Sequence, residues 1–272
     1  MDKGIQYIEQ GEFEVAKEFF LEKVKENKDD AAANHYLGRT YLLLRNHDKA
    51  IEYLERAIEL NSNIADYHFW LGQALGIKAQ NSNIIKQAFI APKILKEFEK
   101  TIELDSTHTG GHVGAANFYI QAPSIMGGDM GKARKEAEIL LTLNEMQGQL
   151  ILIAIYEKEN RPDLAEQAYE EYEKSLDDST GNYQFYNNYG YFLLKQKKYN
   201  KAIKIFQKQV RLAPDEANPH DSLGDSYRAA GRLEEALSEY QKAVEIDATF
   251  KPSLKKIKEL KAQIRKNKNE DS

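Results

Sequence analysis

Two histidines, His108 and His112, lie four residues apart near the predicted start of a helix. This spacing places two imidazoles on one helix face, where both can bind a single metal ion. Gly110 and Gly111 lie between them and weaken the helix, and the sequence fixes no third ligand. We therefore expect a pair of solvated histidines, and we expect no metal or other cofactor.

A second candidate for chemistry is the loop Gly127-Gly128-Asp129, which precedes a predicted helix. Helix N-termini bind anions, but this loop lacks the preceding strand and the G-x-x-x-x-G-K-[ST] spacing of a phosphate loop, and Asp129 would repel phosphate. The chain also has no cysteine and no G-x-S-x-G motif. The sequence thus predicts a structural turn at this loop and a protein that is not an enzyme.

The charge is uneven along the chain. The whole chain carries −5, whereas residues 251–272 carry eight lysines and arginines against three acids, which leaves about −10 on the remainder. An acidic body argues against nucleic acid as a partner, because phosphates require a basic face. No run of eighteen apolar residues is present, so we expect no membrane span.

The elements that must position these side chains follow an internal period. Gly38 and Gly72 are 34 residues apart, as are Gly190 and Gly224. Apolar residues three and four apart follow each glycine, so they share one helix face. A second stripe combines alanines with one large residue and predicts that Leu54, Phe206 and Tyr240 are buried. Each unit is therefore a helix pair that must stack on its neighbours to bury its stripe.

The positions of the prolines agree with helix pairs. All six are predicted to lie between helices or at helix starts: Pro92, Pro123, Pro162, Pro214, Pro219 and Pro252. With these repeats, the chain resembles the tetratricopeptide repeat (TPR) family, in particular bacterial members, over nearly its whole length. It departs from the family at the fourth repeat position, where Asn34, His68, Tyr186 and His220 replace tryptophan. The resemblance implies an all-α, right-handed superhelical solenoid of antiparallel helix pairs.

We expect residues 1–250 to form a single array of about seven such pairs, the first truncated. Insertions near 77–91 and 122–130 are predicted in the turns of the third and fourth pairs, side by side along one edge. In the fourth pair, either Gly114 or Ala115 is the expected close-packing residue.

Both ends of the chain carry expectations as well. Residues 251–272 are predicted to form a C-terminal capping helix and a basic tail, with Leu254, Ile257 and Leu260 covering the last pair. Met1 falls inside the first repeat helix, so we expect a natural N-terminal segment, such as a signal peptide, to precede it. The sequence does not decide between a cytoplasmic and an exported protein.

The resemblance implies that the first helix of each pair lines a concave groove. Carried onto this sequence, the candidate partner-binding residues are His35, Arg39, Leu42, Phe69, Gln73, Phe118 and Tyr191. The family's pocket for a C-terminal carboxylate needs lysine, asparagine and arginine on successive helices. The first three copies lack this set, so binding of a chaperone tail is not expected.

The function that follows is a non-enzymatic protein–protein interaction scaffold that binds a protein or an extended peptide in its groove. We expect the partner to contact the N-terminal half around Arg39, Phe69 and Gln73, with segments 77–91 and 122–130 as its wall. Two alternatives stay open: a small-molecule or glycan binding protein that uses a pocket beside the insertions, and a self-assembling structural scaffold. A homo-oligomer is compatible with each.

Overall fold

The computed structural model describes residues 1–176 and 183–270, with side chains up to residue 266 in the last helix. These residues form helices and turns, and they divide into unit 1 (Met1–Ala168) and unit 2 (Tyr169–Ser272). None of the helices in the described ranges combines the length and the apolarity needed to cross a bilayer.

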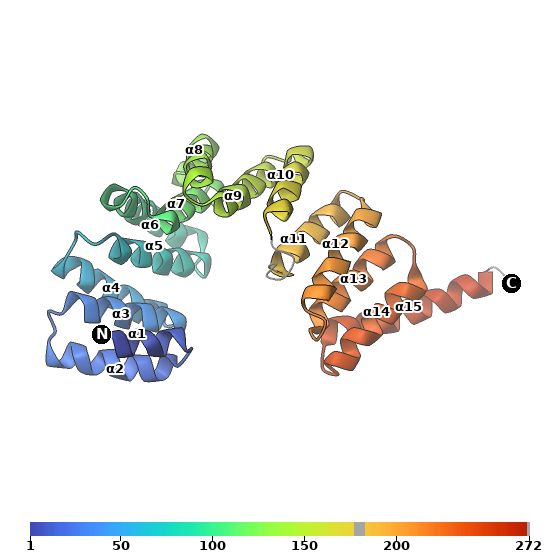
Figure 1. Cartoon of the computed structure of the whole chain (residues 1–272), viewed down its shortest axis with the longest axis horizontal. Helices are drawn as coiled ribbons and strands as arrows, with labels where there is room; N and C mark the ends of the chain where they lie inside the picture. The colour runs from blue at the N-terminus through green and yellow to red at the C-terminus, as the bar shows by residue number, and fades with distance from the viewer. Residues whose placement is uncertain (177–182, 271–272) are drawn as a thin grey trace. The chain divides into compact units, whose positions relative to one another are not determined.

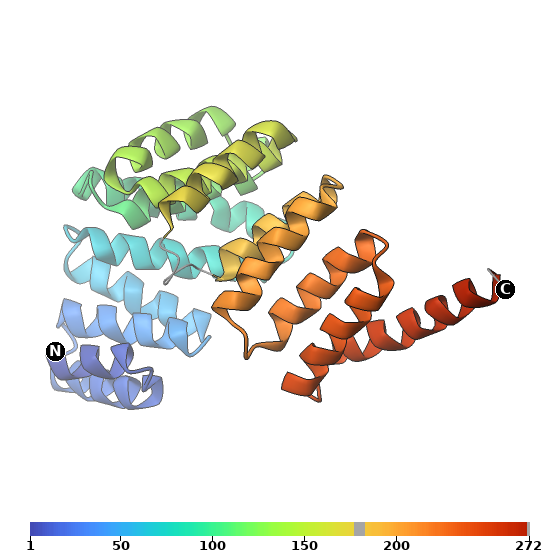
Figure 2. The same cartoon turned by 45° about the vertical axis from the view of Figure 1, so that its right-hand side comes forward.

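Unit 1 is a stack of helices in chain order, and each helix from α1 to α9 packs against the next (Figures 1 and 2). The first helices of neighbouring pairs are also in contact: α3 contacts α5, α5 contacts α7, and α7 contacts α9. The helices are α1 (Asp2–Glu9), α2 (Phe13–Glu26), α3 (Ala31–Leu43), α4 (His47–Leu60), α5 (Ala65–Gln80), α6 (Ile84–Leu104), α7 (Thr109–Gln121), α8 (Met130–Leu143) and α9 (Glu145–Lys158).

Unit 2 repeats the same arrangement. The helix α10 (Pro162–Ser175) spans the boundary between the units, and α11 (Tyr183–Lys195), α12 (Tyr199–Leu212), α13 (Ala217–Ala229), α14 (Leu233–Ile246) and α15 (Lys251–Glu270) follow. From α11 on, each helix packs against the next, and α11 also contacts α13. The chain is thus an all-α repeat solenoid of helix pairs.

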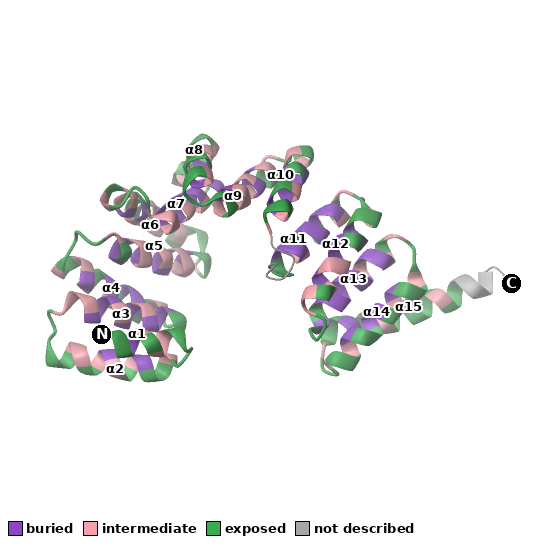
Figure 3. Cartoon of the chain, in the orientation of Figure 1, coloured by how far each residue is buried: buried purple, intermediate pink, exposed green. Residues whose placement is uncertain are grey.

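Small residues bring the two helices of a pair together in both units. A Cβ atom at Gly38 would lie 2.7 Å from Cγ of Leu54, and one at Gly224 would lie 2.5 Å from Cε1 of Tyr240. Leu54, Phe206 and Tyr240 are fully buried, which confirms the prediction for all three. The buried positions face inward along each helix pair (Figure 3).

Buried histidines fix the register of the fourth pair. His68 places Nδ1 2.5 Å from Glu97 and Nε2 3.1 Å from the carbonyl of Ser62, six residues before it. His112 repeats this pattern, with Nδ1 2.6 Å from Glu136 and Nε2 3.0 Å from the carbonyl of Ser106. His112 is therefore the equivalent of His68.

The equivalent of Gly72 is then Ala116, four residues after His112, and not Gly114 or Ala115 as predicted. The close approach at Gly114 serves a different contact. A Cβ atom there would lie 2.4 Å from Cε1 of Phe98, on the second helix of the preceding pair. A sequence with small residues at 114, 115 and 116 offers three helical registers, and the partners of His112 distinguish them.

The first insertion is helical, which corrects the prediction of a long turn. The extra residues lengthen α5 to Gln80 and start α6 at Ile84, so only residues 81–83 form the turn. Asn83 caps α6 by accepting the N–H of Lys86 at 3.0 Å. Pro92 lies inside α6, so the prediction that it lies between helices or at a helix start was wrong. Because Pro92 is exposed, water can bind the backbone carbonyl that its missing N–H leaves without a donor.

The second insertion is a compact turn, as predicted for the double-glycine loop. It contains the short 3₁₀ helix η1 (Ser124–Met126), followed by Gly127 with φ of 102°. A Cβ atom at Gly128 would lie 1.8 Å from the carbonyl oxygen of Ala122, so only glycine fits there. The carboxylate of Asp129 accepts the N–H groups of Gly131 and Lys132 and caps α8.

The helix α15 packs against α14, but the apolar stripe of α15 covers α14 only in part. Leu260 is fully buried and Ile257 is half-buried, whereas Leu254 is 44% exposed, which corrects its prediction. The neighbouring Ser253 is buried instead and donates its hydroxyl to Asp221 at 2.6 Å. A polar contact therefore fixes the start of α15, and this turns Leu254 toward solvent.

Candidate functional site

The two candidate metal ligands are separated by their partners. His108 caps α7 by accepting the N–H of Gly111 at 3.0 Å, and its Nε2 lies 3.2 Å from Asp66. His112 is buried and uses both ring nitrogens on Glu136 and Ser106, so the prediction of a solvated pair was wrong. Among the residues that the structure describes, no three His, Asp or Glu side chains gather in a possible metal site.

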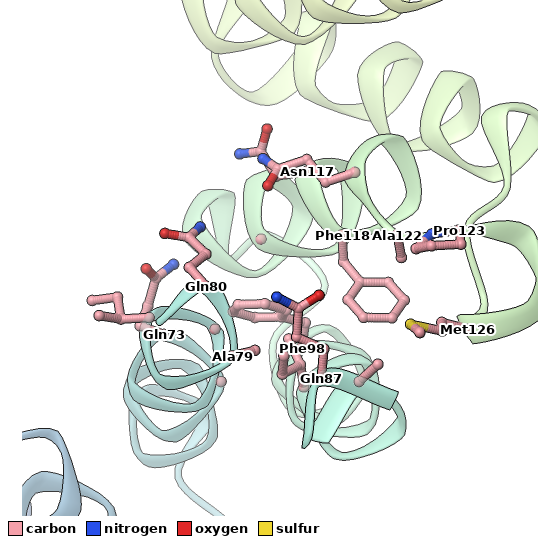
Figure 4. Close-up of a pocket in the computed structure, with 17 residues that line it drawn as sticks. Gln73, Ala79, Gln80, Gln87, Phe98, Asn117, Phe118, Ala122, Pro123 and Met126 are labelled. Carbon is pink, nitrogen blue, oxygen red and sulfur yellow. The ribbon is translucent and has the colours of Figure 1, made fainter. Parts of the chain in front are cut away.

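A cavity of about 310 Å³ opens between α5, α6, α7 and η1 in unit 1 (Figure 4). Its apolar lining includes Phe98 from α6 and Phe118 from α7, and Phe118 lies beside Met126 from η1. Both predicted insertions contribute to it: Ile77, Gln80, Gln87 and Ala91 line one side, and Ala122, Pro123 and Met126 line another.

The polar groups of this cavity are all carboxamides. Five of them line it, and no lining residue is charged: Gln73, Gln80, Gln87, Asn117 and Gln121. A carboxamide both donates and accepts hydrogen bonds, which matches the N–H and C=O groups of a peptide backbone. In a chain with 30% charged residues, an uncharged cavity disfavours ionic ligands.

Gly76 gives this cavity part of its room. It lies within α5, and a Cβ atom there would meet nothing within 4 Å. Glycine inside a helix is less favourable than alanine by about 0.5–1 kcal/mol. No neighbouring atom would clash with a side chain at this position, so close packing does not require the glycine. The space that a side chain would fill is part of the cavity.

Next to the cavity, α3 and α5 carry a cluster of aromatic rings around Arg39. Its guanidinium lies 4.4 Å from the centre of the Trp70 ring and 5.3 Å from that of Tyr36. Phe69 packs edge-to-face on Trp70 and also contacts Phe98 at the base of the cavity, with ring centres 6.4 Å apart. The aromatic surface therefore continues from α3 into the cavity.

Two polar groups in this cluster are buried without partners. Within the described part of the chain, neither Nδ1 of His35 nor Nε of Arg39 forms a hydrogen bond. The imidazole of His35 stacks on Tyr67, and burial together with the nearby charge of Arg39 lowers its pKa to about 3. Burial also lowers the pKa of Arg39. The charge of Arg39 is stabilised mainly by the faces of the Trp70 and Tyr36 rings.

The structure divides the predicted site residues into four groups. Gln73 and Phe118 line the cavity, and Arg39 and Phe69 lie in the adjacent aromatic cluster. His35 and Leu42 are 2% and 8% exposed, and neighbouring side chains cover both. Tyr191 lies in unit 2 and belongs to a different set of contacts.

Unit 2 uses the equivalent positions for its own structure. Tyr191 and Asp225 follow Tyr186 and His220 by five residues, as Arg39, Gln73 and Asn117 follow Asn34, His68 and His112. Tyr191 and Tyr240 donate their hydroxyls to Asp225 at 2.9 and 2.8 Å, and burial beside this carboxylate raises the pKa of both tyrosines.

The ammonium group of Lys256 in α15 completes this cluster. It lies 2.7 Å from both Asp221 and Asp225, and Ser253 donates to Asp221. Arg228 pairs with Glu259, also in α15, at 3.4 Å. The inner polar groups at the end of unit 2 therefore have partners within the unit, which leaves them little to offer a partner molecule.

Sequence reasoning missed several residues of the cavity, among them Gly76, Asn117 and Gln121. Asn117 escaped because the register of its helix was ambiguous, and the match of His112 with His68 and His220 would have placed it. Gly76, Gln80, Gln87 and Gln121 lie within or beside the insertions, where the repeat pattern assigns no position. Only the packing of α5, α6 and α7 brings them together.

Comparisons with known proteins agree with this architecture. Family models described as tetratricopeptide repeat match residues 183–249 and 31–64. Tetratricopeptide repeat protein 37 of Xenopus laevis is 22% identical over 262 residues, and superkiller complex protein 3 of Mus musculus is 22% identical over 265 residues. These alignments cover 95% and 91% of this chain but only 16% of each relative.

A solved structure has the same fold. The tetratricopeptide repeat protein from Parabacteroides merdae superposes with a TM-score of 0.65 at 13% identity, over 95% of this chain and 96% of that one. The recurring glycines, the paired helices and the matching repeat models lead to one conclusion: the chain belongs to the tetratricopeptide repeat family.

Proposed function

We propose that unit 1 is a non-catalytic module that binds an extended, uncharged segment of another protein. Tetratricopeptide repeats generally mediate protein–protein interactions, and this proposal specifies where and what this chain binds. The observation that carries it is the cavity between α5, α6 and α7, with five carboxamides around an apolar base and no charged side chain.

The cavity suits one apolar side chain of such a segment. A volume of about 310 Å³ accommodates a large side chain against Phe98 and Phe118, while the carboxamides bind the backbone on either side of it. In peptide recognition of this kind, main-chain hydrogen bonds supply affinity and the side-chain pocket supplies specificity. The rings around Arg39 extend the contact surface toward α3.

The contrast with unit 2 supports a site in unit 1. At the equivalent positions of α13, Asp221 and Asp225 are bound by Lys256, Ser253 and Tyr240. In α3, by contrast, the described residues leave Nε of Arg39 and Nδ1 of His35 without hydrogen bonds.

The test uses Gly76→Leu, which fills the cavity without a clash because nothing lies within 4 Å of the new Cβ. Random linear peptides are selected on the full chain by display, and the dissociation constant of the best binders is measured by calorimetry. We expect Gly76→Leu to weaken binding about tenfold or more, since burying one large apolar side chain stabilises a complex by roughly 1.5–3 kcal/mol. Gly131→Leu, at an exposed glycine in the first turn of α8, is the matched control.

Three outcomes would contradict the proposal. Selection could yield no peptide, the selected peptides could bind Gly76→Leu and Gly131→Leu equally well, or they could be enriched in charged residues. A neutral oligosaccharide series is titrated in parallel, because carboxamides beside aromatic rings also suit sugar hydroxyls. Binding of a sugar that Gly76→Leu abolishes would replace the peptide with a glycan as the ligand.

A further inference from the structure

The first turns of α6 expose an unusual group of large apolar side chains. Ile84, Ile85 and Phe89 are 59%, 66% and 77% exposed, and Ile125 of η1 is 93% exposed. A shallow hollow lined by Ala88, Pro92 and Ile125 lies between η1 and α6. Ala88 and Pro92 follow Ile84 at spacings of four residues, so the three lie on one face of α6, next to Ile85 and Phe89. Large apolar residues that cluster at the surface generally mark an interaction site.

Three lysines surround these side chains. Lys86, Lys93 and Lys96 lie on α6 and are exposed, and no acidic residue occurs between Ile84 and Lys96. No ion pair involves any of the three within residues 1–176 and 183–266. We call Ile84, Ile85, Phe89 and Ile125 with these lysines the α6 patch.

The carboxylates near the patch have partners of their own. Asp48 of α4 pairs with Lys78 at 2.8 Å, and Glu99, which lies further along α6 and lines the same hollow, accepts the hydroxyl of Tyr119 at 3.1 Å. Asp129, after η1, caps α8. The α6 patch is therefore a local cationic and apolar surface on a chain whose net charge is −5.

We infer that the α6 patch docks the protein on the surface of a membrane that contains anionic lipid. Interfacial helices of this kind insert Ile and Phe side chains into the boundary between headgroups and acyl chains, while lysines bind the lipid phosphates. The charges of the patch are complementary to such a surface, and its apolar side chains are largely exposed. This inference is independent of peptide binding in the cavity.

A second copy of the chain fits the patch less well. A two-fold symmetric contact would bring the patch of one copy against the same patch of the other. Lys86, Lys93 and Lys96 would then face their own counterparts, and like charges brought together oppose association. Anionic lipid supplies the opposite charge without this repulsion.

The experiment measures co-sedimentation of the full chain with vesicles of phosphatidylcholine alone or of phosphatidylcholine and phosphatidylglycerol in equal amounts. We expect binding to the anionic vesicles only, and we expect it to weaken as salt is raised because salt screens the lysines. Two variants remove the patch: Ile85→Ser with Phe89→Ser and Ile125→Ser, and Lys86→Glu with Lys93→Glu and Lys96→Glu. Each should lower the partition onto anionic vesicles at least tenfold.

Matched controls change the same residue types elsewhere. Val15→Ser with Ile246→Ser and Leu254→Ser removes three other exposed apolar side chains, and Lys25→Glu with Lys197→Glu and Lys204→Glu reverses three other exposed charges. Both controls should bind anionic vesicles like the wild type. Since all patch positions are exposed, thermal melts of the patch variants should match the wild type, which separates lost docking from lost folding.

Three results would overturn the inference. The wild type could fail to sediment with anionic vesicles, or the patch variants could sediment as well as the controls. The protein could also form a dimer in light scattering that the serine variant abolishes, with no vesicle binding, which would make the patch a self-association surface.

Discussion

The inner faces of α3 and α13 occupy the same repeat positions, but the side chains on these two faces are stabilised in different ways. In α13, Asp221 and Asp225 are charged and are bound by Lys256, Ser253 and Tyr240 within unit 2. In α3, the equivalent of Asp221 is His35, an uncharged ring stacked on Tyr67. Repeats with the same helix packing can therefore carry ion pairs on the inner face of one helix and aromatic rings on the inner face of another.

The difference follows from what each face packs against. The helix α15 lies beside α13 and brings a lysine and a serine to its carboxylates. The next first helix after α3 is α5, which brings Tyr67, Phe69 and Trp70 instead. A face completed by charges of its own chain is structural, whereas a face with half-buried rings beside an uncharged cavity suits a partner.

The largest expected effect on stability tests the structural role of the α13 face. Asp221→Ala should lower the free energy of unfolding by about 2–3 kcal/mol, because it removes one carboxylate from Lys256 and leaves the buried hydroxyl of Ser253 without its acceptor. Arg39→Ala should cost about 1 kcal/mol, the loss of its contacts with aromatic rings. Denaturant unfolding of both variants measures the difference.

Asp215→Ala, at an exposed position before α13, serves as the control and should leave stability within about 0.5 kcal/mol of the wild type. If Asp221→Ala costs no more than Arg39→Ala, the α13 face is not held by its ion pairs. The affinity for the selected peptides should fall more in Arg39→Ala than in Asp221→Ala.

The second prediction tests what the two units share. Gly38→Leu and Gly224→Leu should each lower the free energy of unfolding by about 1–3 kcal/mol, because a Cβ atom at these positions meets Leu54 or Tyr240 at 2.7 or 2.5 Å. Gly76→Leu has room and should not destabilise α5. Thermal melts that rank Gly76→Leu with the other two would contradict the packing described for the helix pairs.

The third prediction concerns pH and the ring of His35. Its pKa is about 3 in the folded chain and about 6.5 when unfolded, so below pH 6.5 the unfolded state binds more protons. The stability contributed by the neutral ring is complete above pH 6.5 and declines as the pH falls toward 3. At pH 5 the loss should be about 2 kcal/mol.

His35→Phe keeps a stacked ring on Tyr67 and removes the titration. The difference in unfolding free energy between the wild type and this variant should therefore change by about 2 kcal/mol between pH 7 and pH 5. A pH-independent difference at His35 would mean that solvent reaches its ring.

The repeat architecture could be predicted from the sequence because its signals are local. Gly38, Leu54 and Tyr240 lie on helix faces fixed by spacings of three and four residues, and all three occupy the predicted close-packed positions. The insertions fell outside this pattern. Nothing in the residues around Pro92 distinguishes a long turn from two lengthened helices, because solvent exposure makes the proline tolerable inside α6.

The candidate site depended on contacts between distant residues. His112 meets Glu136, which is 24 residues away, and Asp221 meets Lys256, which is 35 residues away. The repeat pattern gives His112 the same kind of glutamate partner as His68 and His220, but the sequence reasoning did not use it and predicted a solvated pair of histidines. The partner of Asp221 is a lysine of α15, which lies outside the repeat pattern.

By itself, the sequence determined the family, the helix pairs and their close-packing residues, because helical periodicity and side-chain size act within one repeat. The tertiary structure decided which polar groups are satisfied and where an uncharged cavity opens. Gly76, Gln87 and Asn117 come together only when α5, α6 and α7 pack, and the lengthening of α5 and α6 determines how they meet. Hydrogen bonding and burial are properties of that assembly, since a side chain's partners are set by the neighbours that folding brings to it.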